Sequence, residues 1–316
     1  MHVHRAADNP GVGSARDAEL LAGARTRRVF AAGDEIPDGG SPVGVFLFLA
    51  GSAELLAETP FGPHPVARLA APALADLRAT LGGSSGVARL RPAAGAGAVF
   101  LPADEARAFV FEGGDAGGAF RRIALASLTS AIRETTASLS RFFEGLSVKP
   151  AAPDPTRAHT IDSDVDLDRA RDLFETAGLD PAILPTLGLT ARTVMPGAAL
   201  VKAGDPGHEA FLLVEGRLRV SLDIAGAGEE ALAILKPGEI VGEMGLVDDA
   251  PRSADVYAHG GPAVVYVLTR DVFQGLLGSG APEGAPLLGG LTLLLARRLE
   301  EAIKKAAGFR ILAGPI

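Results

Sequence analysis

The sequence predicts a mainly β protein with flanking helices, in which two small antiparallel barrels of jelly-roll type are each followed by a helix. Three observations carry this prediction: a pattern that occurs twice, short β-type segments at even spacing in each copy, and an apolar helical stretch after each copy. A repeat of this length indicates one structural unit used twice. Short strands separated by glycine, proline and aspartate are typical of barrels and jelly rolls.

The repeat is clearest near the start of each copy. Residues 28–36 and 45–55 resemble residues 193–201 and 210–220 at an offset of about 165 positions. In both copies the second segment contains a strand pattern, a glycine and a further strand pattern. We therefore expect one barrel in each half of the chain.

The β-type segments of the second copy are short and apolar, and glycine, proline or aspartate separates them. They span residues 211–214, 218–222, 231–235 and 263–268. This length and spacing indicate the strands of a small barrel.

A helical stretch with an apolar seam follows each barrel. The first seam consists of Leu125, Leu128, Ile132, Thr135, Leu139 and Phe142. The second, looser seam consists of Leu288, Leu291, Leu295, Leu299, Ala302 and Ala306. The first seam is either intrachain core or a dimer interface, and a homodimer would form through helices 120–143 or 287–307.

Composition divides the chain into four parts. Residues 1–19 are predicted to be a flexible N-terminus, and residues 20–146 form the first barrel domain. Residues 147–164 are a proline-rich linker with little to bury. The second barrel domain, residues 165–316, begins with a helix at 165–177 and ends with the C-terminal helix.

Composition and charge exclude several classes of protein. With 316 residues and 47% hydrophobic content, the chain is globular rather than disordered. The formal net charge of -8 opposes binding to nucleic acid. The absence of cysteine removes disulfides, zinc–thiolate sites and thiol nucleophiles. Because no secretory signal and no membrane-spanning run is found, we expect a cytoplasmic protein without membrane contact.

The sequence contains no catalytic or metal-binding pattern. Six histidines are scattered along the chain, at positions 2, 4, 64, 159, 208 and 259. None of them has two carboxylates at metal-ligand spacing. No nucleophile–base pair and no Walker-type loop is found. We therefore expect a protein that is not an enzyme and has no metal or cofactor.

Residues 242–254 are the most informative segment, because they place an acid and an arginine nine positions apart around a glycine-bounded turn. Arg252 can offer a planar, charged donor fork to the oxygens of a cyclic phosphate. Glu243 can accept a hydrogen bond from a ribose 2'-hydroxyl and balance the arginine. Gly242 and Gly245 let the main chain come close to the anion. The pattern therefore predicts a site for a small cyclic phosphate ester.

Neighbouring residues support the same site. Residues 244–246 are predicted to form one helical turn whose free N–H groups face the anion. Ser253 adds a neutral donor, and Pro251 restricts the main chain before the arginine. The alternative without a ligand is a structural ion pair between Glu243 and Arg252, which the glycines and the proline disfavour.

Residues 235–256 resemble the phosphate-binding cassette of cyclic nucleotide-binding domains, as found in catabolite activator proteins and protein kinase A regulatory subunits. Residues 204–216 resemble the early strand pair of that family, and the resemblance covers residues 165–307. It implies barrels of the cyclic nucleotide-binding type and these ligand-binding residues: Gly242, Glu243, Met244, Gly245, Arg252, Ser253 and Ala254. A serine at 253 resembles bacterial cAMP binders, whereas threonine would indicate cGMP.

The first copy departs from this pattern. At the repeat offset, the position of Glu243 falls on Leu77 or Arg78, and the position of Arg252 falls on Gly86 or Val87. Both functional charges are therefore missing. The first domain is predicted to be a degenerate cyclic nucleotide-binding fold that is kept for packing or partner contact.

Two other arginines of the first copy, Arg89 and Arg91, could substitute for the missing one, and we consider this the weaker alternative.

The predicted function is a non-enzymatic sensor of cAMP or a related cyclic nucleotide, with an unidentified protein partner. The ligand would neutralise Arg252, draw the cassette inward and move the helix at 287–307. A DNA-binding module is not expected, because no helix-turn-helix pattern is found and the net charge is negative. The alternatives are a scaffold or interaction protein with a vestigial fold, a cyclic dinucleotide binder and, more distantly, a transcription factor.

Overall fold

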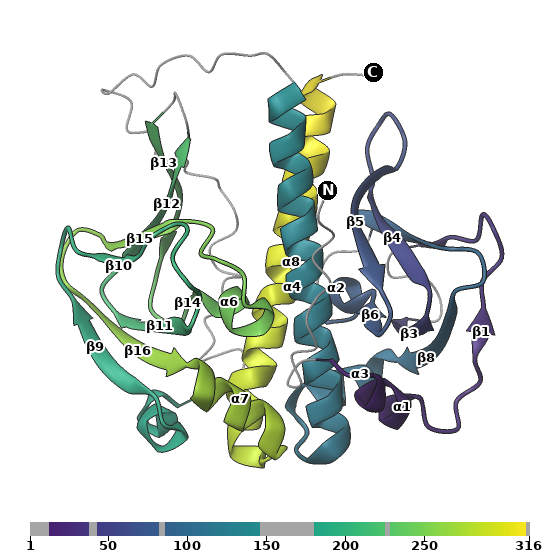
Figure 1. Cartoon of the computed structure of the whole chain (residues 1–316), viewed down its shortest axis with the longest axis horizontal. Coiled ribbons are helices and arrows are strands. Elements are labelled where there is room, and N and C mark those ends of the chain that lie inside the picture. Colours follow the sequence, from purple (N-terminus) through teal and green to yellow (C-terminus); the bar gives the residue numbers. More distant parts are fainter. Residues whose placement is uncertain (1–12, 38–42, 82–85, 146–179, 225–227, 314–316) are drawn as a thin grey trace. The chain divides into compact units, whose positions relative to one another are not determined.

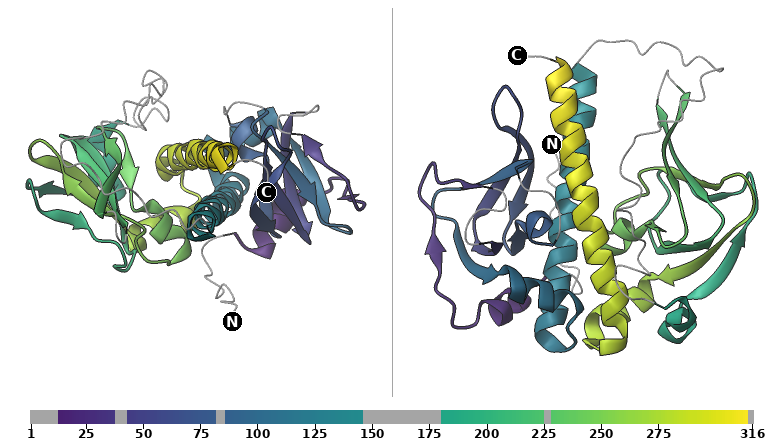
Figure 2. Two further views of the ribbon diagram at one scale, coloured as in Figure 1. Left: turned by 90° about the horizontal axis from the view of Figure 1, so that it is seen from above. Right: turned by 180° about the vertical axis from the view of Figure 1, so that it is seen from behind.

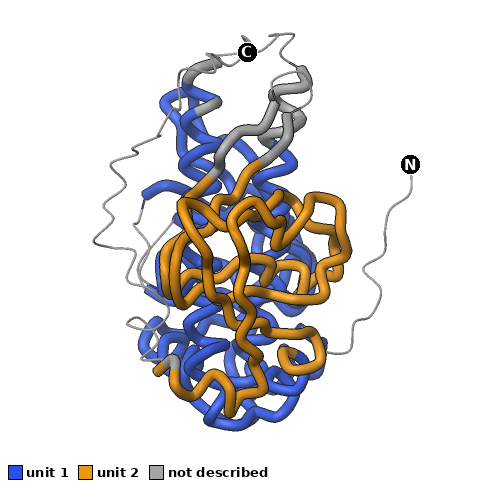
Figure 3. The backbone as a smooth tube through the Cα atoms, turned by 90° about the vertical axis from the view of Figure 1, so that its left-hand side faces the viewer, with its two compact units in different colours: residues 1–146, 274–316 blue, residues 147–273 orange. Residues whose placement is uncertain are grey.

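The computed structural model describes residues 13–37, 43–81, 86–145, 180–224 and 228–313. The chain forms two compact units (Figure 3): unit 1 comprises Met1–Leu146 and Gln274–Ile316, and unit 2 comprises Ser147–Phe273. The expected linker at 147–164 and helix at 165–177 lie outside the described residues.

Unit 1 contains the first barrel and most of the long helices (Figure 1). Its elements before the linker are α1 (Ala15–Ala22), β1 (Arg28–Val29), β2 (Ile36–Pro37), β3 (Gly44–Ala50), β4 (Ser52–Ala57), β5 (His64–Ala70), β6 (Ala73–Ala75), α2 (Leu77–Thr80), β7 (Ala88–Pro92), β8 (Gly97–Pro102), α3 (Ala103–Phe111) and α4 (Gly114–Gly145). Its C-terminal elements are η2 (Pro282–Gly284) and α8 (Ala285–Ala313).

Unit 2 contains the second barrel. Its elements are η1 (Pro181–Leu187), β9 (Thr190–Val194), β10 (Ala199–Val201), β11 (Glu209–Glu215), β12 (Leu218–Ile224), β13 (Gly228–Leu235), β14 (Ile240–Val241), α6 (Glu243–Asp248), β15 (Asp255–Ala258) and β16 (Ala263–Thr269). Helix α7 (Arg270–Ser279) begins in unit 2 and ends in unit 1.

Each unit has two four-stranded antiparallel sheets with the same strand order. In unit 1 the orders are β1-β8-β3-β6 and β2-β7-β4-β5, and in unit 2 they are β9-β16-β11-β14 and β10-β15-β12-β13. Each strand of unit 1 therefore has a counterpart in unit 2 whose number is higher by eight, so that β1 corresponds to β9 and β8 to β16. This confirms the prediction of two jelly-roll barrels with flanking helices.

Irregularities of the strands repeat as well. The register shifts between Phe48 and Ala50 in β3, and between Leu213 and Glu215 in the equivalent β11. The turn after each of these strands contains a glycine with positive φ, Gly51 in unit 1 and Gly216 in unit 2. Because such details depend on local backbone geometry, their recurrence supports one structural unit used twice.

The barrel core of unit 2 is built from the inward faces of both sheets. It consists of Val194, Val201, Phe211, Leu213, Leu218, Leu235, Val256, Ala258, Ala263, Val265 and Val267. Phe211 and Leu213 alternate along β11, as expected for a strand with one buried face. This core holds β15, which follows the predicted cassette, and β11, which contacts α6.

The N-terminus corrects one expectation. Residues 1–19 were expected to be flexible, but residues 15–19 belong to α1. The Ser14 hydroxyl accepts from the amide of Asp17, and the Asp17 carboxylate accepts from the amide of Ser14, which is a capping box. Arg122 on α4 then donates to the same carboxylate at 2.6 Å, so α1 is fixed to the long helix.

Helices α4 and α8 lie side by side in unit 1 (Figure 2). The side chains of Leu139 and Phe142, which complete the first predicted seam, lie outside the described residues. Leu125, Leu128 and Ile132 of the first seam are buried within the chain. In the second seam Leu291, Leu295 and their apolar neighbours are also buried, together with Ile303, which the looser pattern did not include. The helix expected to belong to the second domain is therefore part of unit 1.

None of the helices in the described ranges combines the length and the apolar character needed to span a membrane.

Candidate functional site

The predicted cassette forms a short helix between two strands of unit 2. Gly242 precedes α6 with φ 83°, a left-handed conformation that favours glycine. Helix α6 spans Glu243–Asp248 and ends at Asp249, which also has positive φ. The helical turn expected at residues 244–246 is thus present, bounded on both sides by left-handed residues.

The guanidinium of Arg252 is half-buried against this helix. Its Nη1 donates to the carbonyl of Gly242 at 2.8 Å, and its Nη2 donates to the carbonyl of Glu209 on β11. The guanidinium carbon also lies 5.8 Å from the ring centroid of Phe211. These contacts hold the donor fork beside the first turn of α6.

Gly242 is required for this arrangement. A Cβ at this position would come within 2.3 Å of the Arg252 Nη1 atom and within 3.0 Å of the Glu209 carbonyl. The positive φ at Gly242 would also strain any other residue. The glycine therefore serves both the turn and the arginine, whereas the sequence pattern assigned it to the approach of the main chain to an anion.

The loop before β11 encloses Arg252 from the other side. The amide of Arg252 donates to the carbonyl of Asp205, and the amide of Gly204 donates to the carbonyl of Arg252, both at 2.9 Å. Further along the loop, a Cβ on Gly207 would lie 2.9 Å from the Cα of Gly245. The loop and α6 thus approach main chain to main chain, which only glycine allows.

The electrostatics of the site combine the charge of Arg252 with those of nearby acids. Burial lowers the pKa of the Arg252 guanidinium, while the charges of Glu209, Glu243 and Asp205 act in the opposite direction. Arginine remains protonated at neutral pH despite such a shift. A half-buried cation whose hydrogen bonds go to neutral carbonyls can form a stronger hydrogen bond with an additional, charged acceptor.

The other predicted ligand-binding residues differ in exposure. Glu243 is 1% exposed, and its charge acts on the pKa of Arg252 as expected for a balancing acid. Met244 and Ala254 are half-buried, and Ser253 is exposed. Arg252 and Gly242 are joined directly by a hydrogen bond.

Strand register identifies the counterparts of these residues in unit 1. Ala53 pairs with Pro92 where Leu218 pairs with Ala258, so the position of Arg252 corresponds to Gly86. The left-handed residue before the short helix α2 is Asp76, with φ 66°, so Glu243 corresponds to Leu77. The turn geometry recurs in the first barrel with neither functional charge.

The two alternative arginines of the first barrel contact carboxylates. Arg89 donates to Glu35 at 2.8 Å and to Glu58, and Arg91 donates to Glu35 at 2.8 Å. These donor groups are therefore already bound to anions of the protein itself.

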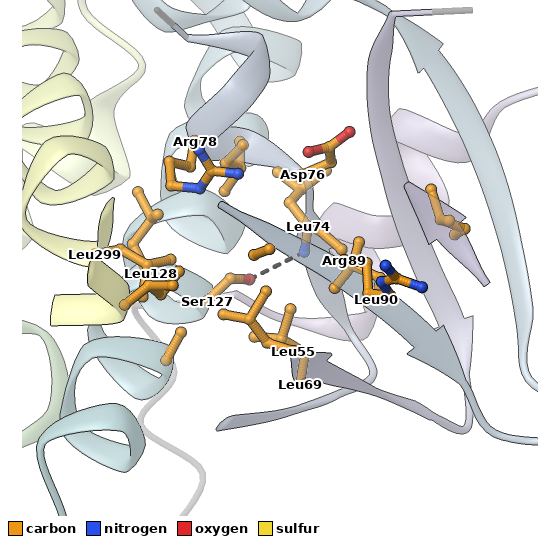
Figure 4. Close-up of a pocket in the computed structure, with 16 residues that line it drawn as sticks. Leu55, Leu69, Leu74, Asp76, Arg78, Arg89, Leu90, Ser127, Leu128 and Leu299 are labelled. Carbon is orange, nitrogen blue, oxygen red and sulfur yellow. Dashed lines mark hydrogen bonds between the residues drawn. The ribbon is translucent and has the colours of Figure 1, made fainter. Parts of the chain in front are cut away.

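Figure 4 shows a pocket in unit 1, at the counterpart of the cassette. It is lined mainly by apolar side chains. Leu299 and Ile303 of α8 contribute to its wall. Arg78 of α2 lies 4.0 Å from Glu300, which also belongs to α8. Helix α8 therefore packs against α2, the counterpart of α6 in the first barrel.

Within the described ranges no group of histidine, cysteine, aspartate or glutamate could hold a metal ion. Four neighbours of the site were not predicted from the sequence: Asp205, Gly207, Phe211 and the main chain of Glu209. The glycine-rich start of the loop at 204–207 was a usable signal for two of them. No sequence signal could identify the carbonyl of Glu209, because every residue has a main-chain carbonyl.

The family model for the cyclic nucleotide-binding domain matches residues 191–279. This chain is 38% identical over 90 residues to the cAMP-dependent protein kinase regulatory subunit of Colletotrichum orbiculare, which covers 28% of the chain and 22% of that protein. It is 36% identical over 102 residues to Acetyltransferase Pat of Mycolicibacterium smegmatis, and the match covers 32% of this chain and 30% of that protein. It is also 36% identical over 112 residues to the Cyclic AMP receptor protein of Thermus thermophilus, covering 35% and 49%.

The matched segment of this chain thus spans less than half the length of each of these relatives.

Proposed function

Since residues 191–279 form a domain of the cyclic nucleotide-binding family, we propose that the chain is a non-enzymatic sensor of a cAMP-type cyclic nucleotide. The observation that carries this proposal is the half-buried guanidinium of Arg252, which main-chain carbonyls hold beside α6. Such a fork is the group that a cyclic phosphate needs, since its charge is permanent and its geometry is bidentate.

In the proposed complex the ring phosphate of the nucleotide accepts from Arg252, with Ser253 as a further donor. Glu243 accepts from the ribose 2'-hydroxyl. Discrimination against a 2'-deoxy nucleotide would then be about 1–3 kcal/mol, the cost of leaving a buried polar group unpaired. Gly242 and Gly245 keep the space beside the anion free of side chains.

The choice of cAMP as ligand rests on two supports. Two of the similar proteins are named for cAMP, a kinase regulatory subunit and a receptor protein. In addition, Ser253 stands where a threonine would indicate cGMP. We place the first barrel outside ligand binding, because Leu77 and Gly86 occupy the positions of the acid and the arginine.

The output of the sensor is proposed to be contact with another protein rather than with DNA. The net charge of -8 opposes association with a polyanion. The similarity to an acetyltransferase covers only 30% of that protein. We therefore do not include acetyltransferase activity in the proposed function.

A thermal-shift screen of the full chain with cyclic mononucleotides and cyclic dinucleotides tests the proposal. We expect stabilisation by cAMP, growing with the logarithm of its concentration once binding is saturated. Stabilisation by a cyclic dinucleotide alone would assign a different ligand. Stabilisation by none of them would favour a scaffold with a vestigial fold.

Substitution of Arg252 tests the residue that carries the site. In Arg252→Ala the phosphate loses two charged hydrogen bonds, each worth about 1.5–3 kcal/mol, so cAMP affinity should fall by about a hundredfold or more. Isothermal titration calorimetry measures this loss, and the melting temperature should stay within about 4 °C.

Arg192→Ala is the matched control. Arg192 lies 5.5 Å from the same Phe211 ring, but it is exposed and pairs with the carboxylate of Glu209. Its loss removes the same charge from unit 2 without touching the cassette. Equal affinity of the Arg252→Ala variant and the wild-type chain would contradict the proposed site.

A further inference from the structure

Arg270 is a second arginine that binds the cassette. Its Nη2 donates to the carbonyl of Gly207 at 3.0 Å and to the carbonyl of Gly245 at 2.8 Å. Its Nη1 forms an ion pair with Asp249, the residue that ends α6. One side chain thus holds the loop before β11, the middle of α6 and the end of α6.

Arg270 is also the first residue of α7. Its amide donates to the carbonyl of His208 at 3.0 Å, so the main chain at the start of α7 is fixed to the same loop. Because the main chains of Gly207 and Gly245 are in contact, α6 cannot shift along the loop without displacing the carbonyls that Arg270 holds.

The first barrel lacks this connection. Gly44 pairs with Pro102 where Glu209 pairs with Thr269, so Ala103 is the counterpart of Arg270. The amide of Ala103 donates to the carbonyl of Val43 at 3.0 Å, the same main-chain bond that Arg270 makes. The copy without the acid and the arginine of the cassette therefore also lacks the arginine at the start of the following helix.

The other end of α7 is fixed within unit 1. The carbonyl of Leu277 accepts from Arg122 of α4 at 2.7 Å, and the carbonyl of Gly280 accepts from the amide of Gly114 at 2.9 Å. Helix α7 is therefore anchored at both ends, at Arg270 within unit 2 and at Leu277 within unit 1.

We propose that Arg270 is a positioning residue that couples occupancy of the cassette to α7. This inference rests on the proposed function, since it specifies how the same site is read out. A nucleotide held by Arg252 and Glu243 draws α6 inward, and Arg270 follows through the Gly245 carbonyl and Asp249. The ligand can shift α7 only by its differential affinity for the two positions of α6.

Hydrogen exchange of the full chain, with and without saturating cAMP, tests the coupling. In the wild-type chain we expect cAMP to slow exchange in both α6 and α7 by about five- to tenfold. In Arg270→Ala, which places in unit 2 the residue found at the counterpart in unit 1, cAMP should slow exchange in α6 and change α7 by less than about twofold.

Two further variants sharpen the test. Arg270→Lys keeps the charge but replaces the planar fork, so it should lose most of the coupling. Arg192→Gln removes an exposed arginine of the same unit and should keep the wild-type response. A merely structural role of Arg270 would raise exchange in α7 equally with and without cAMP and leave the ratio unchanged, which would overturn the inference.

The outcomes separate this inference from the function on which it rests. If calorimetry shows that the wild-type chain binds cAMP but α7 exchange does not respond, the coupling is wrong and the sensor function stands. Retention of the full α7 response in Arg270→Ala would have the same meaning. Failure of the wild-type chain to bind cAMP would overturn both.

Discussion

At the scale of single residues, the two barrels build the same turn with different side chains. Gly242 and Asp76 both adopt positive φ before a short helix. In unit 2 the residue must be glycine, because Arg252 occupies the space where a Cβ would lie. In unit 1 the arginine is replaced by Gly86, and an aspartate is tolerated at the turn. The loss of one residue thus relaxes the requirement on another.

Gly242→Ala should therefore impair ligand binding as well as stability. The left-handed backbone costs about 1–2 kcal/mol of unfolding free energy for a residue with a Cβ. The new methyl group also displaces the Arg252 guanidinium, so we expect the affinity for cAMP to fall by about tenfold or more. Urea unfolding and calorimetry measure the two effects.

The control is Gly197→Ala, because Gly197 has φ 79° and no atom lies within 4 Å of the position that its added Cβ would take. It should show the same backbone cost without a loss of affinity. Equal affinities in the two variants would show that the space at Gly242 is not needed for binding.

At the scale of elements, α1 is fixed to α4 by a partly buried ion pair between Asp17 and Arg122. Asp17 accepts from Arg122 through two nitrogens and from the amide and hydroxyl of Ser14. Burial raises the pKa of the Asp17 carboxyl, but the bonds from Arg122 and Ser14 outweigh it and lower the pKa below its ordinary value of 3.8. The ionised carboxylate is therefore the form that stabilises the fold.

Asp17→Asn should lower the unfolding free energy of unit 1 by about 2 kcal/mol at neutral pH, because Arg122 loses its charged partner. Since the folded pKa is depressed, the contribution is fully present above pH 3.8 and is lost as the pH falls through the folded value. The difference between variant and wild type should thus shrink in acid, which urea unfolding across pH measures.

Glu19→Gln on the exposed face of α1 is the control and should have little effect at any pH. A difference between Asp17→Asn and wild type that persists at pH values well below the folded pKa would argue against the ion pair as its source.

At the scale of the whole molecule, the helix that follows the second barrel in the sequence completes the core of the first. Leu287, Leu291 and Leu295 of α8 are each at most 1% exposed within unit 1. The pocket at the counterpart of the cassette has Leu299 and Ile303 of the same helix in its wall. Helix α8 thus follows the second barrel in the sequence but belongs to the fold of unit 1.

Leu291→Ala should destabilise unit 1 by about 2–5 kcal/mol, because it opens a cavity between buried helices. The chain has no tryptophan and two tyrosines, Tyr257 and Tyr266, which both lie in unit 2. Tyrosine fluorescence therefore reports unit 2, while far-UV circular dichroism reports both units. We expect the variant to lower the dichroism midpoint and leave the fluorescence midpoint in place.

Leu294→Ala, at a half-buried position of the same helix, should have a smaller effect on the dichroism midpoint. A fluorescence midpoint that falls together with the dichroism midpoint in Leu291→Ala would show that the two units unfold as one.

The sequence was sufficient for the two barrels, four strands of the second barrel and the cassette turn. These features depend on patterns between near neighbours: alternation along strands such as β11, the 3–4 spacing of the seam on α4, and glycines beside an acid and an arginine. Each of them restricts the conformation of a few consecutive residues, so it can be recognised without knowing the rest of the fold.

Tertiary structure alone decided the assignment of α8 to unit 1, the attachment of α1 to α4, and the contacts of Arg270. Arg122 meets Asp17 across 105 positions of sequence, and Arg270 bonds mainly to carbonyls, which every residue carries. A side chain whose partner is a distant residue or a main-chain oxygen leaves no local pattern, because its position depends on how the whole chain packs.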